Sequence, residues 1–244
     1  MQIYSSLVQG AQDGNKRFAV LIDPDKYSME QLKKLINISQ KAGVDFFFFG
    51  GSLLTRDQQD LFIKLIKKSC DIPVVLFPGN HFQINIKADG ILFLSLISGR
   101  NPELLIGKHV VAAPYLKASK LEVIPTGYML IDGGNRTTVG YMSNTDPIPA
   151  EKSEIAVCTA LAGELLGLRL LYLDAGSGAS NPIPLNMIKQ VKKYTTMPLV
   201  IGGGIRTPSQ ASGASKAGAD VVVVGNAIEQ DLKLVPKLSE AIHS

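Results

Sequence analysis

The chain has 244 residues, of which 45% are hydrophobic and 19% are charged, and its formal net charge is +4. This length and apolar content suit one barrel-sized domain over residues 1–244 and are short for two domains. The basic residues are scattered and are not interleaved with aromatic residues, which argues against a nucleic-acid partner, whereas a mild positive charge is compatible with anionic substrates.

The cysteines and the apolar runs of the sequence indicate in which cellular compartment the protein is found. Cys70 and Cys158 are too few for a disulfide framework or a cysteine metal site, and both lie in apolar helical contexts, so we expect inert, buried thiols. The first residues lack the apolar core of a signal peptide. The longest apolar run, Ile91–Ile97, is far below the roughly 20 residues that span a bilayer. We therefore expect a cytoplasmic protein without an integral membrane segment.

Eight short apolar runs are distributed over the whole chain, and helical patterns alternate with them. Most runs are continuously apolar, as expected for parallel strands that are covered on both faces. Eight strands alternating with helices in about 240 residues is the count of a (β/α)8 TIM barrel, an α/β fold. The strand-like runs begin at Phe18, Asp45, Pro73, Gly90, Leu121, Leu170, Pro198 and Asp220, and the helical patterns cover Met29–Ala42, Arg56–Ser69, Pro102–Ile106, Glu151–Leu166, Leu185–Tyr194, Ser209–Ala217 and Glu229–Ile242.

Two intervals depart from the regular alternation. Only about a dozen residues, PGNHFQINIKAD, separate Phe77 from Gly90, too few for a loop, a helix and a return loop. We predict that the third barrel helix is absent or replaced by an extended segment, which exposes apolar residues of the strands beneath it. Between Asp132 and Ala150 the chain is polar and glycine-rich. For this interval we predict a long loop without regular structure, on the catalytic face.

Glycine-rich loops follow the last two strands. Gly202, Gly203 and Gly204 end the seventh strand, and Gly225-Asn226 ends the eighth strand and leads into a new helix. Backbone N–H groups from two such loops and a helix start can cradle a phosphate, which TIM barrels commonly bind at this position. The glycines can also be simple tight turns.

Carboxylates and hydroxyls follow other strands. A carboxylate at Asp23 and a hydroxyl at Ser52 suit Mg²⁺, which takes waters and substrate phosphates as its other ligands. Asp23 can instead cap the following turn, and capping is the favoured interpretation for Asp25. Asp132 and Asp174 follow the fifth and sixth strands.

Among the tyrosines and histidines, Tyr172 is a further candidate for the functional site. Tyr172 lies on the same side of its strand as Asp174, so its hydroxyl can reach a phosphate oxygen, or it is a core tyrosine. We expect His81 in a loop, and His109 and His243 on the surface or at helix ends. No Ser–His–Asp or Cys–His arrangement can be assembled, so the predicted site consists of phosphate, Mg²⁺ and carboxylate.

Five motifs carry a resemblance over almost the whole chain. They are LIDPDK at Leu21–Lys26, GGS at Gly50–Ser52, YLDAGSGA at Tyr172–Ala179, GGGIRT at Gly202–Thr207 and VVGNAIE at Val223–Glu229. Any one glycine motif is shared by many phosphate-binding barrels, whereas five in this order and spacing are specific. Together they resemble the geranylgeranylglyceryl phosphate synthase family.

The resemblance implies a Mg²⁺-dependent prenyltransferase. It would join a polyprenyl group, geranylgeranyl-like, from its diphosphate to a hydroxyl of sn-glycerol 1-phosphate and release diphosphate. By motif, Asp23 and Ser52 would bind Mg²⁺, and Asp23 and Asp174 would be catalytic. The family also implies a barrel without its third helix and a homo-oligomer, and a lipid product allows a transient membrane contact. Glycerol 1-phosphate would be held by Tyr172, Leu173, Asp174, Ala175, Gly176, Ser177, Gly178, Gly203, Gly204, Gly225 and Asn226.

Two positions depart from the family pattern. Family members usually carry glutamate in place of Asp174; the shorter side chain displaces the carboxylate by about 1.5 Å, and displacements of about 1 Å can cost roughly a hundredfold in rate. Some members carry lysine in place of Leu21, and the leucine here matches the second of the family's two groups.

Two other functions stay open from the residues. A phosphosugar isomerase or aldolase on the same barrel needs a strand-end lysine for a Schiff base or a pair of acid–base carboxylates. The sequence offers Lys26 in a loop and the pair Asp23 and Asp174. A non-catalytic phosphate-binding protein would keep the glycine loops without turnover.

Overall fold

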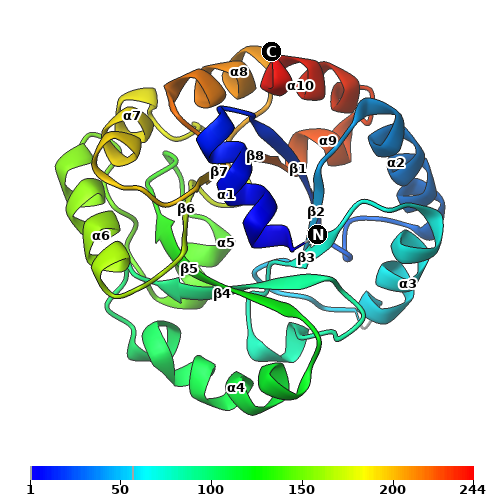
Figure 1. Cartoon of the computed structure of the whole chain (residues 1–244), viewed down its shortest axis with the longest axis horizontal. Helices are drawn as coiled ribbons and strands as arrows, with labels where there is room; N and C mark the ends of the chain where they lie inside the picture. Colours follow the sequence, from blue (N-terminus) through cyan, green and yellow to red (C-terminus); the bar gives the residue numbers. More distant parts are fainter. Residues whose placement is uncertain (1, 57) are drawn as a thin grey trace.

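The computed structural model describes residues 2–56 and 58–244. Eight parallel strands are hydrogen-bonded in chain order and close into a barrel, with β1 paired to both β2 and β8 (Figure 1). Each strand begins within one residue of its predicted run, and the predicted TIM barrel is confirmed. The strands are β1 (Arg17–Ile22), β2 (Phe46–Phe49), β3 (Val74–Leu76), β4 (Gly90–Leu96), β5 (Glu122–Leu130), β6 (Leu170–Asp174), β7 (Leu199–Gly202) and β8 (Val221–Val224).

The barrel strands separate two buried apolar layers. Phe46 and Phe48 of β2 belong to the layer inside the barrel, and Phe47 and Phe49 pack outward against the helices. Because both faces of the strand are covered, all four residues are buried and the run is continuously apolar.

A ring of helices covers the outside of the barrel (Figure 1). Ser28 caps the first of them with Gln31, and Thr207 caps a later one with Gln210 beside Pro208. Such capping boxes are local signals, which is why these helix starts follow from sequence. The ring consists of α2 (Met29–Ala42), α3 (Gln59–Ser69), α4 (Lys108–Ala118), α6 (Ser153–Leu165), α7 (Leu185–Tyr194), α8 (Pro208–Ala217) and α10 (Leu234–His243).

The interval between β3 and β4 holds a single 3-10 turn, η1 (His81–Gln83), where the third barrel helix would be. The predicted absence of that helix is confirmed. Gln83 fastens the segment to its neighbours: its Oε1 accepts from Gly79 N–H at 3.0 Å and its Nε2 donates to Gly51 O at 2.9 Å. The segment therefore joins the loops after β2 and β3.

Two helical predictions were wrong in extent. The segment predicted as Pro102–Ile106 is a π-helical turn, η2 (Glu103–Gly107), that continues into α4. Pro114 lies inside α4. Because an interior proline usually ends a helix, the sequence pattern underestimated the length of α4. The predicted helix Glu229–Ile242 is two helices, α9 (Asn226–Gln230) and α10, because Asp231 accepts backbone N–H groups between them.

The long interval Asp132–Ala150 is not without regular structure, contrary to the prediction. It contains α5 (Thr138–Ser143), which begins where the Thr137 hydroxyl accepts from Gly140 N–H. The cap is a local signal that the high glycine content obscured. Its position is as predicted, at the carboxyl ends of the strands, where Thr138 and Met142 line a cavity.

An N-terminal helix that the sequence analysis did not predict, α1 (Ile3–Asp13), crosses the barrel at the amino ends of the strands (Figure 1). Ile3 and Leu7 pack into the inner layer. Glu122, at the start of β5, accepts from the N–H groups of Ile3 and Tyr4 at 2.6 and 2.8 Å, which caps the helix. With this end closed, the carboxyl ends of the strands form the mouth of the barrel.

The two cysteines differ in their exposure. Cys70 is buried as expected, but Cys158 is exposed, because it lies on the outer side of α6. Within the described part of the chain, no helix has both the length and the apolar character to cross a membrane.

Candidate active site

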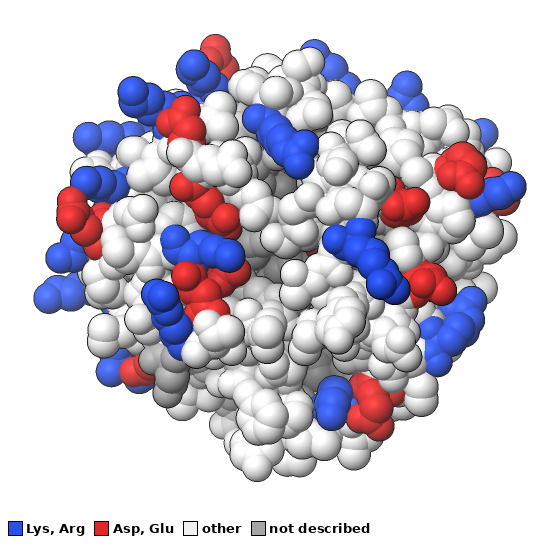
Figure 2. Space-filling view, turned by 180° about the vertical axis from the view of Figure 1, so that it is seen from behind, with Lys and Arg blue, Asp and Glu red and all other residues white. Residues whose placement is uncertain are grey.

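A cavity of about 670 Å³ opens at the carboxyl ends of the strands. Figure 2 shows the face opposite that of Figure 1, hollowed near its centre with charged side chains of both signs around it. One end of the cavity is lined by glycine loops and carboxylates, and the other by apolar side chains from β4, α4 and the segment after β3. The polar end includes Asp23, Ser52, Asp174, Ser177, Gly178, Gly203, Gly204, Gly225 and Asn226, and the apolar arm includes Phe77, Ile84, Ile91, Leu92, Phe93, Leu94, Leu104, Ala112 and Leu116.

Three loops bring unpaired backbone N–H groups to the polar end. Gly203 and Gly204 have φ of +80° and +70°. A Cβ on Gly203 would lie 2.6 Å from Asp174 Oδ1 and 2.7 Å from Gly176 N, so a larger residue does not fit. Such an array of N–H groups is suited to a phosphate. Across residues 2–56 and 58–244, no protein acceptor takes the N–H of Ser177, Gly203, Gly204, Gly225 or Asn226.

Asn226 joins the loop after β6 to the start of α9. Its Oδ1 accepts from Gly178 N–H at 3.0 Å and from the Ser177 hydroxyl at 3.1 Å, and its Nδ2 donates to Glu229 Oε2 at 3.1 Å. Three predicted residues, Ser177, Gly178 and Asn226, thus meet at one place. Glu229, which the sequence analysis did not select, lines the same cavity.

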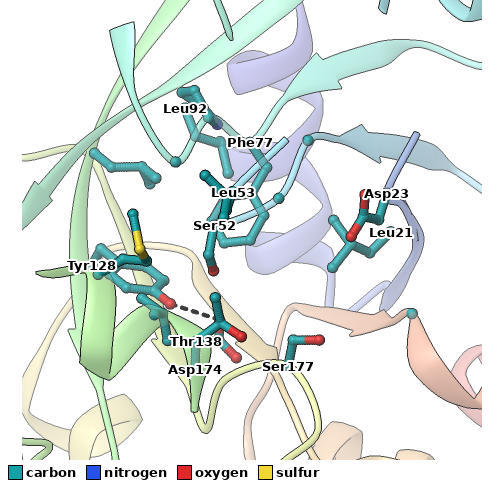
Figure 3. Close-up of a pocket in the computed structure, with 18 of the residues that line it drawn as sticks. Leu21, Asp23, Ser52, Leu53, Phe77, Leu92, Tyr128, Thr138, Asp174 and Ser177 are labelled. Atoms are coloured by element: carbon teal, nitrogen blue, oxygen red, sulfur yellow. Dashed lines mark hydrogen bonds between the residues drawn. The ribbon is translucent and has the colours of Figure 1, made fainter. Parts of the chain in front are cut away.

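Asp174 is held at the bottom of this end. Its Oδ2 accepts from the Tyr128 hydroxyl at 2.7 Å (Figure 3), and its Oδ1 accepts from Gly176 N–H at 2.8 Å. Burial raises the pKa of Asp174 above its usual value, although both hydrogen bonds oppose that shift. Burial, and then the Asp174 charge, raise the pKa of Tyr128 well above 10, so the phenol is a neutral donor.

Tyr128 was missed by the sequence analysis, although a signal was present. It pairs in register with Tyr172 in the neighbouring strand, and both are inner-layer residues close to their strand ends. The alternation that selected Tyr172 therefore applies to Tyr128 as well. Tyr172 is itself buried, with its ring stacked on Phe77 at a centroid distance of 4.9 Å.

Not every residue of the predicted run reaches the cavity. Leu173 and Ala175 belong to the outer apolar layer, and the Gly176 N–H donates a hydrogen bond to the Asp174 carboxylate. Among the described residues, none of these three lines the cavity. Asp132 is exposed and lies outside it as well.

The two aspartates of the first loop have different roles. Asp23 lines the cavity, and its Oδ1 accepts from Asp25 N–H at 3.0 Å; burial, and then the nearby Asp25 charge, raise its pKa. Asp25 was expected to cap its own turn, and this was wrong. Its carboxylate accepts from the N–H groups of Thr55 and Arg56 and from the Thr55 hydroxyl, which ties the first loop to the loop after β2.

Two further groups shape the cavity walls. Burial, together with the Asp23 charge, raises the pKa of Glu229. His109 lies in the first turn of α4, which agrees with the predicted helix end, but it is buried and does not lie on the surface. Its ring packs edge-on against Phe93, with 4.3 Å between centroids, and its Nε2 lies 3.3 Å from Ser95 Oγ. Burial lowers the pKa of His109, so its ring is a neutral part of the apolar arm.

Comparison with known proteins gives one consistent result. The PcrB family model matches residues 12–242. The chain is 51% identical to a geranylgeranylglyceryl phosphate synthase of Chitinophaga pinensis, over 100% of this chain and 96% of that protein. It is 52% identical to one of Spirosoma linguale, over 94% and 92% of the two chains.

A solved structure agrees with these relatives. The crystal structure of (S)-3-O-geranylgeranylglyceryl phosphate synthase from Thermoplasma acidophilum, in complex with its substrate sn-glycerol-1-phosphate, superimposes with a TM-score of 0.94. That enzyme is 33% identical, and the match covers 100% of this chain and 99% of that one. The family and enzyme class predicted from the motifs are confirmed. The chain belongs to the PcrB family and is a prenyltransferase of the geranylgeranylglyceryl phosphate synthase type.

Proposed function

We propose that this chain transfers a geranylgeranyl-like polyprenyl group from its diphosphate to a hydroxyl of sn-glycerol 1-phosphate, in the cavity at the barrel mouth. The observation that carries the proposal is the continuity of this cavity. A set of unpaired N–H groups suited to a phosphate and an apolar arm suited to a prenyl chain share one space. The T. acidophilum enzyme, which binds sn-glycerol-1-phosphate, has the same fold.

In the proposed reaction the bond between prenyl C1 and the diphosphate oxygen breaks, and an ether bond forms between C1 and the glycerol oxygen. The loops at Gly203-Gly204 and Gly225-Asn226 hold the acceptor phosphate and so orient its hydroxyl. The hydroxyl proton passes to Asp174, whose raised pKa makes it a stronger base than an exposed aspartate. Tyr128 and Gly176 each occupy one lone pair of this carboxylate, and each oxygen can accept a further hydrogen bond.

The first loop suits the predicted Mg²⁺. Asp23 has one oxygen held by Asp25 N–H, while its Oδ2 lies beside Gly51 near the cavity surface, and the Ser52 side chain also lines the cavity. Within the described ranges no cluster of three or more His, Cys, Asp or Glu residues is arranged for a metal, which fits an ion that takes its remaining ligands from water and substrate phosphates. Bound at Asp23 and Ser52, Mg²⁺ would neutralise charge on the departing diphosphate.

A homo-oligomer is part of the proposal. Leu165 and Leu166 at the end of α6 are 88% and 79% exposed, and Val110 and Tyr115 of α4 are 65% and 69% exposed. Exposed apolar residues of this kind often mark protein or membrane contacts. Light scattering coupled to gel filtration measures the mass in solution; a mass of 26.2 kDa at all concentrations would contradict the oligomer.

The experiment that tests the function uses a matched pair of aspartates. Purified protein is incubated with Mg²⁺, sn-glycerol 1-phosphate and labelled polyprenyl diphosphates of increasing length. Asp23→Asn should abolish transfer because it removes the charge that faces the cation. Asp132→Asn, an exposed strand-end aspartate outside the cavity, should leave transfer unchanged. If the unmodified chain forms no ether product with any donor, the proposal is wrong.

A further inference from the structure

The Asn226 side chain connects parts of the phosphate cradle that are far apart in sequence. Its Oδ1 accepts from Gly178 N–H, 48 residues away, and from the Ser177 hydroxyl. Asn226 begins α9, and Glu229 lies one turn later on the same side of this short helix. The carboxamide therefore lies between the loop after β6 and Glu229.

The two ends of a carboxamide have opposite hydrogen-bonding capacity. In the observed orientation Oδ1 faces two donors, and Nδ2 donates to Glu229 Oε2 at 3.1 Å. A flipped carboxamide would place its NH₂ against the Gly178 N–H, and its oxygen against the Glu229 carboxylate. Because an ionised carboxylate only accepts hydrogen bonds, Glu229 stabilises one orientation and disfavours the other.

Glu229 is an acidic residue in a cavity that is suited to a phosphate. A carboxylate beside a phosphate repels it, and Glu229 also faces the negative charge of Asp23. Direct contact with the acceptor phosphate would therefore be unfavourable. A favourable contribution of Glu229 to phosphate binding would have to act through its hydrogen bond to Asn226.

We propose that Glu229 is a positioning residue for the acceptor phosphate: by fixing the direction of the Asn226 carboxamide it holds the Ser177–Gly178 turn against the start of α9. The inference rests on the proposed function, because it assumes that this cradle binds sn-glycerol 1-phosphate. Holding the loops in place before the ligand arrives removes part of the ordering cost of binding.

Two substitutions separate the hydrogen bond from the charge. Glu229→Gln removes the charge and keeps an acceptor for Asn226 Nδ2, whereas Glu229→Met removes both at nearly the same length. Glu240→Met, on the exposed side of α10, is the matched control. The dissociation constant of sn-glycerol 1-phosphate is measured by calorimetry in the presence of a chelator and without prenyl donor, so that any role of Glu229 as a cation ligand does not contribute.

Glu229→Gln should bind sn-glycerol 1-phosphate within about threefold of the unmodified chain, and Glu229→Met about fivefold more weakly than Glu229→Gln, the usual contribution of one hydrogen bond between neutral groups. In turnover assays the KM for the acceptor should rise in Glu229→Met, with the KM for the prenyl diphosphate unchanged.

Equal affinity of Glu229→Gln and Glu229→Met, or a difference seen only when Mg²⁺ is present, would overturn the positioning role. The proposed function fails separately, if the unmodified chain binds the acceptor but transfers no prenyl group. No binding of the acceptor by the unmodified chain overturns both.

Discussion

The hydrogen bond between Tyr128 and Asp174 gives the sharpest test of the site. Tyr128→Phe removes one oxygen from a bond of 2.7 Å whose two residues are 5% and 7% exposed. A hydrogen bond to an ionised group contributes about 1.5–3 kcal/mol, and a neutral one about 1 kcal/mol. The penalty on the free energy of unfolding should therefore depend on whether Asp174 is ionised.

The sign follows from the direction of the pKa shift. Burial raises the pKa of Asp174 in the folded chain above its ordinary value of 3.8, so its ionisation lowers stability as pH rises from that value through the raised pKa. The Tyr128 hydroxyl opposes this shift, and its removal raises the pKa of Asp174 further. The penalty of Tyr128→Phe should therefore grow with pH, from about 1 kcal/mol toward about 1.5–3 kcal/mol.

The assay is urea denaturation of both proteins over a range of pH from acidic to alkaline. Tyr141→Phe is the matched control, because Tyr141 of α5 is 79% exposed, and an exposed substitution should change stability by less than about 0.5 kcal/mol at any pH. The acidic limb of the pH–rate profile for prenyl transfer should also move to higher pH in Tyr128→Phe, because the pKa of Asp174 is raised further. A penalty that is constant with pH, or no larger than that of Tyr141→Phe, would refute the proposed dependence on Asp174 ionisation.

Two further predictions concern the two ends of the cavity. Gly203→Ala should abolish binding of sn-glycerol 1-phosphate, because its φ is +80° and its Cβ would meet Asp174; Gly167→Ala, with φ of +84° and open space, should cost only about 1–2 kcal/mol of stability. Calorimetric titration and urea denaturation measure both effects, and equal affinity of the two variants would contradict the cradle. Ala112→Phe fills the apolar arm and should lower kcat/KM for geranylgeranyl diphosphate about tenfold or more, with acceptor affinity unchanged, whereas Ala113→Phe, exposed on the same helix, should not. Equal kcat/KM values for these two variants would place the prenyl chain elsewhere.

Several features of this protein followed from its sequence because their causes are local. The eight strands were recognisable because burial on both faces requires continuously apolar runs. The absence of the third helix followed from the number of residues between Phe77 and Gly90, which is too small for a loop, a helix and a second loop back to the next strand. Gly203 and Gly204 were selected because glycine, which has no Cβ, lets the backbone approach a ligand closely. In the structure both residues also have positive φ.

Other features were decided only by the tertiary structure, because they depend on contacts between residues far apart in the chain. The bond from Tyr128 to Asp174 joins residues 46 positions apart, and that from Asn226 to Gly178 joins residues 48 apart. No local pattern marks Glu122 as the cap of α1, because Glu122 lies 119 residues after Ile3 in the chain. Closure of the barrel brings these residues together, since it places the ends of all eight strands at one mouth. The eight strands, most helices of the outer ring and the glycine loops thus followed from the sequence, and the closed barrel decided which side chains meet at its mouth.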